Sequence, residues 1–143
     1  MAFNVLVVDD SAVMRAMIAR VVRMSGVPLD ALHEAGDGAE GLRQLREHWI
    51  DLVLLDVNMP VMNGEEMLRH LRADPETAHL PVIVVSTESS ETRVHALEQL
   101  GVAFLHKPFA PEDLRAIILR VTGVTPDDDY YAVPAADGRA LDF

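Results

Sequence analysis

Short aliphatic runs that each end in a polar residue constrain this chain more than any other feature. The clearest run is 52–55, four consecutive aliphatic residues followed by Asp56 and, four residues further on, by Pro60. A run of this kind is typical of a strand buried on both faces of a parallel sheet, and the proline prevents the strand from continuing. A lone aspartate at such a position is commonly a turn or helix-capping residue, so its meaning depends on the rest of the chain.

Similar runs predict strands at 3–8, 29–34, 80–85 and 102–106, and helices are expected between the strands and after the last one. Val13 and Ala116 are expected on the apolar sides of the first and last helices, with Pro111 opening the last helix and Gly123 ending it. Five strands alternating with five helices predict a (βα)5 doubly wound α/β fold of the flavodoxin-like type, with a parallel sheet in the order 2-1-3-4-5. The first expected helix has Asp10 or Ser11 as its N-cap and ends at Gly26, and the last begins at Pro111 and ends near Gly123. The helices between them are expected at 39–48, 65–72 and 90–100.

Composition excludes several classes of function. A net charge of −11 argues against a nucleic-acid-binding surface, and the absence of cysteine excludes disulfides and thiolate metal sites. The six histidines show no i,i+3 or i,i+4 spacing, which argues against a zinc site. The apolar runs are far shorter than the roughly 18 residues that span a bilayer, and the N-terminus lacks signal-peptide features. We expect a cytoplasmic protein with one domain over 1–123 and an acidic, disordered tail over 124–143.

Polar residues stand at the ends of four predicted strands. Asp9 and Asp10 follow the first strand, Asp56 the third, Ser86 the fourth and Lys107 the fifth. In the order 2-1-3-4-5 the three aspartates converge, and each carboxylate pair at 4 Å costs about 4 kcal/mol at an effective dielectric near 20. Such a cluster takes up protons or binds a cation, and oxygen ligands favour Mg²⁺. With a hydroxyl and an ammonium nearby, the set could handle a phosphoryl group, with Asp56 as nucleophile.

The motifs that contain these residues resemble the receiver domains of two-component response regulators, and most closely the stand-alone, chemotaxis-type (CheY-like) members. The resemblance covers about residues 3–122, and its motifs are 8–11, 56–60, 62–64, 81–86 and 107–109. It implies that Asp56 is the phosphoacceptor. It also implies that Asp10, Asp56 and the backbone carbonyl of Asn58 bind Mg²⁺ directly, and that Asp9 does so through water.

The same resemblance assigns roles to the other strand-end residues. Lys107 would contact the phosphoryl group, Ser86 would be the switch hydroxyl, and the Lys107–Pro108 peptide bond would be cis. The chain departs from the family at Thr87, where alanine or glycine is usual and a β-branched side chain should narrow access to the phosphoryl group. It departs again at Phe104, where many members have a switch tyrosine, because phenylalanine cannot donate a hydrogen bond.

The resemblance also implies partners. A histidine kinase or histidine phosphotransfer protein would supply the phosphoryl group, and an output protein, for example in chemotaxis or motility, would bind the surface of the fourth helix, fifth strand and fifth helix. We expect a monomer before phosphorylation, and a phosphoacceptor with self-catalysed phosphotransfer and autodephosphorylation, not a conventional enzyme. The residues expected on that surface are Arg93, His95, Phe104, Lys107 and Arg115.

Two other hypotheses remain, a scaffold and a hydrolase, and a third, a flavin-binding protein, fails. A receiver-like scaffold could bind partners without phosphorylation, although the intact acidic set argues against it. A hydrolase of the aspartyl-phosphate class would need an Asp-x-Asp pair after the first strand, where this chain has the adjacent Asp9 and Asp10. A flavin-binding protein would need a hydroxyl- and glycine-rich phosphate loop that the sequence lacks after the first strand.

Overall fold

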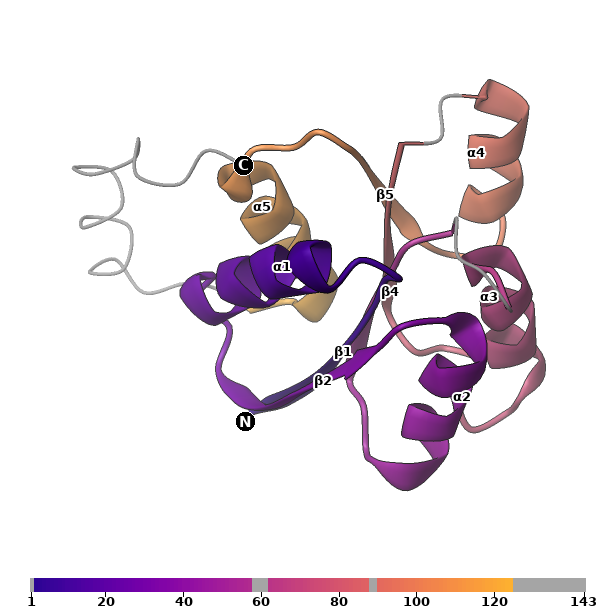
Figure 1. Ribbon diagram of the computed structural model, residues 1–143, viewed down its shortest axis with the longest axis horizontal. Coiled ribbons are helices and arrows are strands. Elements are labelled where there is room, and N and C mark those ends of the chain that lie inside the picture. Colours follow the sequence, from indigo (N-terminus) through magenta and orange to yellow (C-terminus); the bar gives the residue numbers. More distant parts are fainter. Residues whose placement is uncertain (1, 58–61, 88–89, 125–143) are drawn as a thin grey trace.

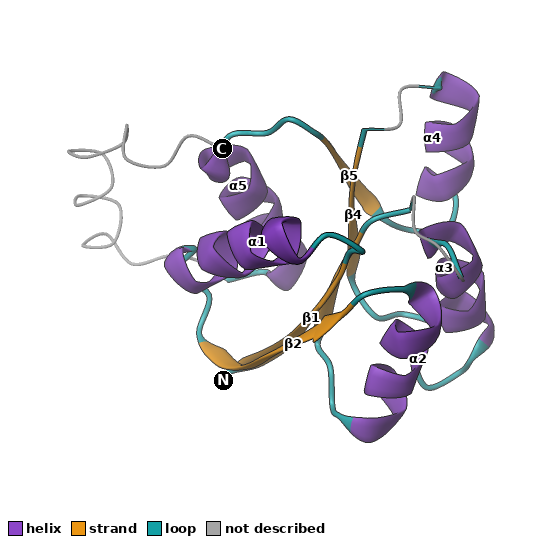
Figure 2. Cartoon of the chain, in the orientation of Figure 1, coloured by secondary structure: helices purple, strands orange, loops and turns teal. Residues whose placement is uncertain are grey.

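A five-stranded parallel sheet lies between two layers of helices (Figures 1 and 2). The computed structural model describes residues 2–57, 62–87 and 90–124. The strand order is β2-β1-β3-β4-β5, which confirms the predicted α/β fold and strand order. The strands are β1 (Phe3–Val8), β2 (Leu29–Ala35), β3 (Leu52–Leu55), β4 (Val82–Ser86) and β5 (Ala103–His106). The helices are α1 (Ala12–Met24), α2 (Gly38–Glu47), α3 (Gly64–Ala73), α4 (Glu91–Glu98) and α5 (Pro111–Thr122).

Helices α1 and α5 cover one face of the sheet, and α2, α3 and α4 cover the other (Figure 1). The strands supply side chains to both layers because successive residues of a strand point to opposite faces. In β1, Val5 and Val7 belong to the core under α1 and α5, whereas Leu6 and Val8 belong to the core under the other three helices. The central strands are therefore buried on both sides, as their unbroken aliphatic runs predict.

Two expected core positions are wrong. Val13 is 72% exposed because it lies in the first turn of α1, while the buried side chains of this helix begin only at Ile18. Ala116 is also exposed, and Leu114 takes the buried position in the first turns of α5. Helical spacing defined the apolar stripe of each helix, but the exact part of the stripe that meets the sheet depends on tertiary packing.

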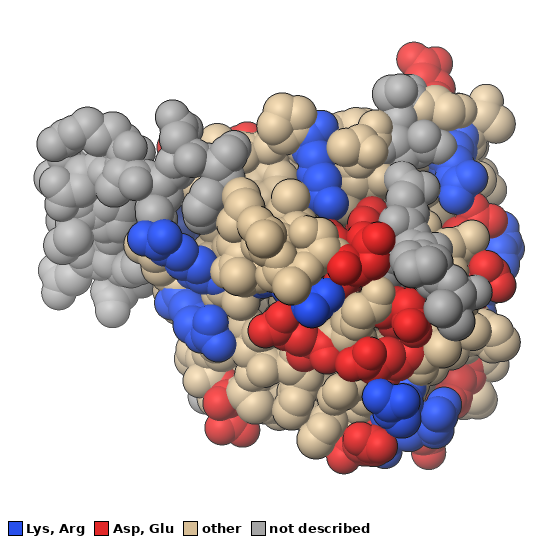
Figure 3. Space-filling model, viewed as in Figure 1, with Lys and Arg blue, Asp and Glu red and all other residues tan. Residues whose placement is uncertain are grey.

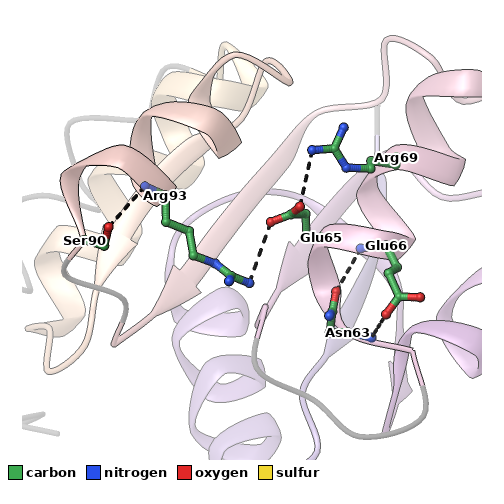
Figure 4. A network of polar contacts seen from close by, with 6 residues as sticks. All are labelled: Asn63, Glu65, Glu66, Arg69, Ser90 and Arg93. Carbon is green, nitrogen blue, oxygen red and sulfur yellow. Dashed lines mark hydrogen bonds and ion pairs between the residues drawn. The ribbon is translucent and has the colours of Figure 1, made fainter.

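Side-chain caps fix the helix N-termini near the carboxyl edge of the sheet. Ser11 and Asp37 accept hydrogen bonds from backbone N–H groups three residues ahead, in α1 and α2. Asn63 and Glu66 form a reciprocal capping box at the start of α3 (Figure 4). Ser90 caps α4 at 3.4 Å. These caps determine where α1, α2, α3 and α4 begin, and so where the loops before them end.

Candidate functional site

Three carboxylates meet at the carboxyl edge of the sheet, as the strand-end pattern predicts. Strands β1 and β3 are neighbours with Val8 opposite Leu55, so the residues that follow, Asp9 and Asp56, emerge side by side. The Asp56 N–H donates to the Val8 carbonyl at 2.9 Å, which continues the ladder by one residue. One oxygen from each of Asp9, Asp10 and Asp56 lies within 4.8 Å of the other two. Asp9 and Asp56 are buried, and Asp10 is exposed at the mouth of the cluster.

Lys107 supplies a positive charge to this cluster. Its Nζ donates to Asp9 Oδ2 at 3.2 Å and lies 3.9 Å from Asp56 Oδ2. The amide that carries this side chain is itself fixed, because the Lys107 N–H donates to the Ser86 carbonyl at 2.9 Å. The Lys107–Pro108 peptide bond is cis. One ammonium against three carboxylates leaves a formal charge of about −2, which a divalent cation would balance.

The donors of the cluster suit a hard cation. All three offer carboxylate oxygen, the ligand type that Mg²⁺ prefers, and the outermost of them is open to solvent. Asp9 already has one oxygen engaged by the Ser11 N–H at 2.9 Å and the other by Lys107. Both carboxylate oxygens of Asp9 are therefore already in contact with donors of the protein. The predicted fourth donor, the Asn58 carbonyl, lies outside the described residues.

The other predicted site residues occupy different positions around the cluster. Ser86 is fully buried at the end of β4, and Thr87, the next residue, is exposed. Phe104 is partly buried against the core beneath α4, and its ring lies 4.6 Å from that of His106, measured between centroids. Acidic side chains gather near the N-terminal ends of α1 and α2, with basic side chains around them on the same face (Figure 3).

Two arginines expected on the predicted partner surface are directed elsewhere. Arg93 reaches from α4 to α3, where its Nη2 lies 3.7 Å from Glu65 Oε1 (Figure 4). Arg115 donates from Nε to the Ser25 carbonyl at the C-terminal end of α1, at 3.1 Å. The Arg115 side chain therefore packs toward α1, and its place on the partner surface stays a prediction. Both arginines make tertiary contacts that sequence spacing does not reveal.

Two further residues support the site and were not singled out as functional from the sequence. Arg15 donates from Nη1 to the Asp9 carbonyl and pairs with Glu34 at 2.9 Å, so it braces the turn that follows β1. Gly64 lies against the backbone of Asp56, directly after β3. A Cβ at this position would be 2.3 Å from the Asp56 carbonyl oxygen. Gly64 belongs to the motif 62–64 of the family resemblance, which marks the position without giving the reason for it.

The chain matches the family of response regulator receiver domains over residues 5–119. Chemotaxis protein CheY-3 of Vibrio cholerae is 35% identical over 113 residues, which cover 78% of this chain and 85% of that protein. Chemotaxis protein CheY of Pseudomonas aeruginosa is 36% identical over 119 residues, covering 82% of this chain and 94% of that protein. The solved structure of the chemotaxis response regulator CheY4 of Vibrio cholerae has a TM-score of 0.75 at 32% identity, and the match covers 85% of this chain and 99% of that one.

Fold and site together define a receiver with an acidic cluster at the edge of a doubly wound sheet. The chain belongs to the response regulator receiver family, and it is CheY-like within that family. This confirms the resemblance drawn from the motifs. Within the described residues, no helix has the length and apolar character needed to cross a membrane.

Proposed function

We propose that this protein is a phosphoryl-accepting switch in a two-component phosphorelay, with Asp56 as the phosphoacceptor. The observation that carries the proposal is the position of Asp56, buried at the end of β3 with Lys107 Nζ 3.9 Å from its Oδ2 and two further carboxylates beside it. A carboxylate oxygen of Asp56 would attack the phosphorus of a phosphohistidine. The P–N bond would break, the imidazole would leave, and an aspartyl phosphate would form.

The residues around Asp56 would stabilise the charge that develops on the phosphoryl oxygens. We assign the cation site to Asp10 and Asp56, with Asp9 acting through water and the Asn58 carbonyl as a further ligand. Bound Mg²⁺ would neutralise phosphoryl oxygens and lower the repulsion among the carboxylates. Lys107 would turn from Asp9 toward the phosphoryl group, because that group brings more negative charge than either carboxylate.

The response would pass from the site to the surface of α4, β5 and α5. Ser86 would donate its hydroxyl to the phosphoryl group, and Thr87 would border that group and narrow its access. Phe104 would change rotamer, moving without the hydroxyl contact that a tyrosine makes. An output protein, in chemotaxis or motility as the relatives suggest, would then bind the altered surface. The phosphodonor would be a histidine kinase or a histidine phosphotransfer protein, and we place these events in the cytoplasm.

We also propose how the rest of the chain is organised. The receiver domain would occupy residues 1–123 and the acidic tail 124–143, which lies almost entirely outside the described residues. The unphosphorylated protein would be a monomer. The protein would catalyse only its own phosphorylation and dephosphorylation.

Beryllofluoride, an analogue of the phosphoryl group, tests this function directly. Wild type and Asp56→Asn would be mixed with beryllofluoride and Mg²⁺, or with acetyl phosphate and Mg²⁺, and followed by backbone NMR and intact mass. We expect one phosphoryl mass on wild type alone, with amide shifts at Ser86, Lys107 and Phe104. A scaffold that works without phosphorylation would show neither change, and its partner would bind Asp56→Ala as tightly as wild type.

A further inference from the structure

An open groove of about 630 Å³ runs between α4 and β5, away from the acidic cluster. Its lining residues are Glu91, Val94, His95, Glu98 and His106. The first four lie at i, i+3, i+4 and i+7 and so form a single stripe along α4. The other wall is β5, which is an edge strand because it pairs only with β4 in the described sheet. The groove is therefore an open surface between one face of α4 and an edge strand, and its lining residue His106 contacts Phe104.

The charge of this groove is negative and unbalanced. Glu91 and Glu98 are both exposed, and within the part of the chain that the structure describes neither forms an ion pair. The only lysine or arginine of α4, Arg93, does not line the groove and lies beside Glu65 of α3 (Figure 4). Lys107, which follows β5, points into the acidic cluster instead. The two cations nearest in sequence are thus engaged elsewhere.

The spacing of the two carboxylates sets the spacing of a complementary partner. Glu98 lies seven helical positions after Glu91, which corresponds to about 10.5 Å along the axis of α4. Val94 provides an apolar contact between them. A partner helix laid along the groove would match this pattern with basic side chains at i and i+7 and an apolar side chain at i+3 or i+4. A partner strand is less suitable, because β5 has only four residues to pair with it.

We infer that the groove between α4 and β5 binds a basic amphipathic helix of the output protein, with two Lys or Arg side chains one seven-residue step apart that pair with Glu91 and Glu98. This inference rests on the proposed function, and it specifies the chemistry of the partner. The negative charge of the whole chain would speed the encounter with such a helix and would repel an acidic one.

A synthetic helical peptide tests the inference. The probe is a labelled 18-residue Ala-based peptide with lysines seven residues apart and leucine between them. One control peptide carries glutamates in place of the lysines, and another has the same composition with its lysines on opposite faces. Binding to the full chain, with and without beryllofluoride, would be measured by fluorescence polarisation, and the contact surface would be mapped by backbone NMR.

The protein variants separate local pairing from overall charge. Glu91→Gln with Glu98→Gln removes the two groove carboxylates, and Glu47→Gln with Glu76→Gln removes two exposed carboxylates at the end of α2 and after α3. We expect the groove pair to weaken binding of the probe threefold to tenfold and the control pair to change it by less than about 1.5-fold, because exposed ion pairs act over short range in physiological salt. Peptide-induced shifts should concentrate at Val94, His95 and His106.

Three results would overturn the inference: equal losses in the two variant pairs, equal binding of the acidic or rearranged peptide, or shifts centred on another surface. Uptake of beryllofluoride by both variants, followed by ¹⁹F NMR, reports on the phosphoryl site separately. A chain that takes up beryllofluoride but shows any of those three results disproves the basic-helix partner alone. A chain that binds the probe in the groove but takes up no beryllofluoride disproves the phosphorylation switch alone.

Discussion

Replacing Gly64 with alanine should disturb both the stability of the protein and the position of Asp56. The added Cβ would lie 2.3 Å from the Asp56 carbonyl oxygen and 2.5 Å from the Val57 Cα. Real Cβ atoms keep at least 3.0 Å from such neighbours, so the α3 N-terminus and the end of β3 must separate by at least about 0.7 Å. Both contacts are to backbone, and no flexible side chain can move aside to relieve them.

The cost follows from the packing of this region. Overpacking of a tight interior costs about 1–3 kcal/mol, and alanine returns at most about 1 kcal/mol through its better helix propensity. We expect the free energy of unfolding to fall by about 1–3 kcal/mol, which for a domain of this size lowers Tm by roughly 4–10 °C. Displacement of the Asp56 backbone by a large fraction of an ångström should also slow its phosphorylation by about 10- to 100-fold.

Gly36→Ala is the matched control. A Cβ at Gly36 would meet only side-chain atoms, the nearest being Arg15 Nη1 at 3.8 Å, which is an ordinary contact. This variant should unfold within about 0.5 kcal/mol of wild type. Urea unfolding followed by circular dichroism measures stability, and acetyl phosphate labelling followed by intact mass measures the rate. Wild-type values of both quantities in Gly64→Ala would refute the argument that this close approach positions the phosphoacceptor.

Three other perturbations give distinct outcomes. Lys107→Met should destabilise the protein by about 1–3 kcal/mol in EDTA, measured by urea unfolding, and by less with Mg²⁺, because a bound cation replaces the lost charge among the carboxylates. Arg72 donates to four backbone carbonyls of the turns that follow α3 and α4, so Arg72→Ala should lower the free energy of unfolding by about 1–3 kcal/mol, measured by urea unfolding. The control Arg69→Ala removes only an exposed ion pair, and it should lower the free energy of unfolding by less than about 0.5 kcal/mol. Burial and the neighbouring His48 lower the pKa of His33. The unfolded chain therefore binds the proton more readily, and the free energy of unfolding decreases as pH falls below about 6.5. Between pH 7 and pH 5 the Tm of a His33→Gln variant should fall by less than the Tm of wild type, and an equal fall would exclude His33 as the cause.

The strands could be predicted from local sequence, and the acidic cluster followed from them once the strand order was assumed. The aliphatic runs identify buried strands, and in a parallel sheet every strand ends at the same edge, so Asp9 and Asp56 had to converge once β1 and β3 were neighbours. Helix ends were predicted less exactly. The helix expected to reach residue 100 ends at Glu98, and a positive φ at Gly101 turns the chain into β5.

Contacts between distant segments could not be predicted from spacing. The histidines show no helical spacing, yet the rings of His33 and His48 stack with centroids 4.0 Å apart because β2 and the end of α2 lie together. Arg72 looked like an ordinary surface residue of α3, and only the tertiary structure brings carbonyls such as those of Leu80 and Leu100 to its guanidinium. These contacts depend on which loops meet, which single-sequence periodicity does not determine.

The contacts of α3 suggest how the acidic site and the groove communicate. Gly64 lies against the Asp56 carbonyl, and the next residue, Glu65, pairs with Arg93 in the first half of α4 (Figure 4). Glu65 also pairs with Arg69, whose Nη2 lies 3.3 Å from Oε2, so the two oxygens of one carboxylate contact arginines of both helices. A half-exposed ion pair of this kind is worth at most about 1 kcal/mol, or a fivefold change in a two-state equilibrium. The Glu65–Arg93 pair therefore contributes only weakly to holding α4 against α3. Under the proposed switch, a change at Asp56 would have to supply only a similarly small free energy to alter the groove on the other side of that helix.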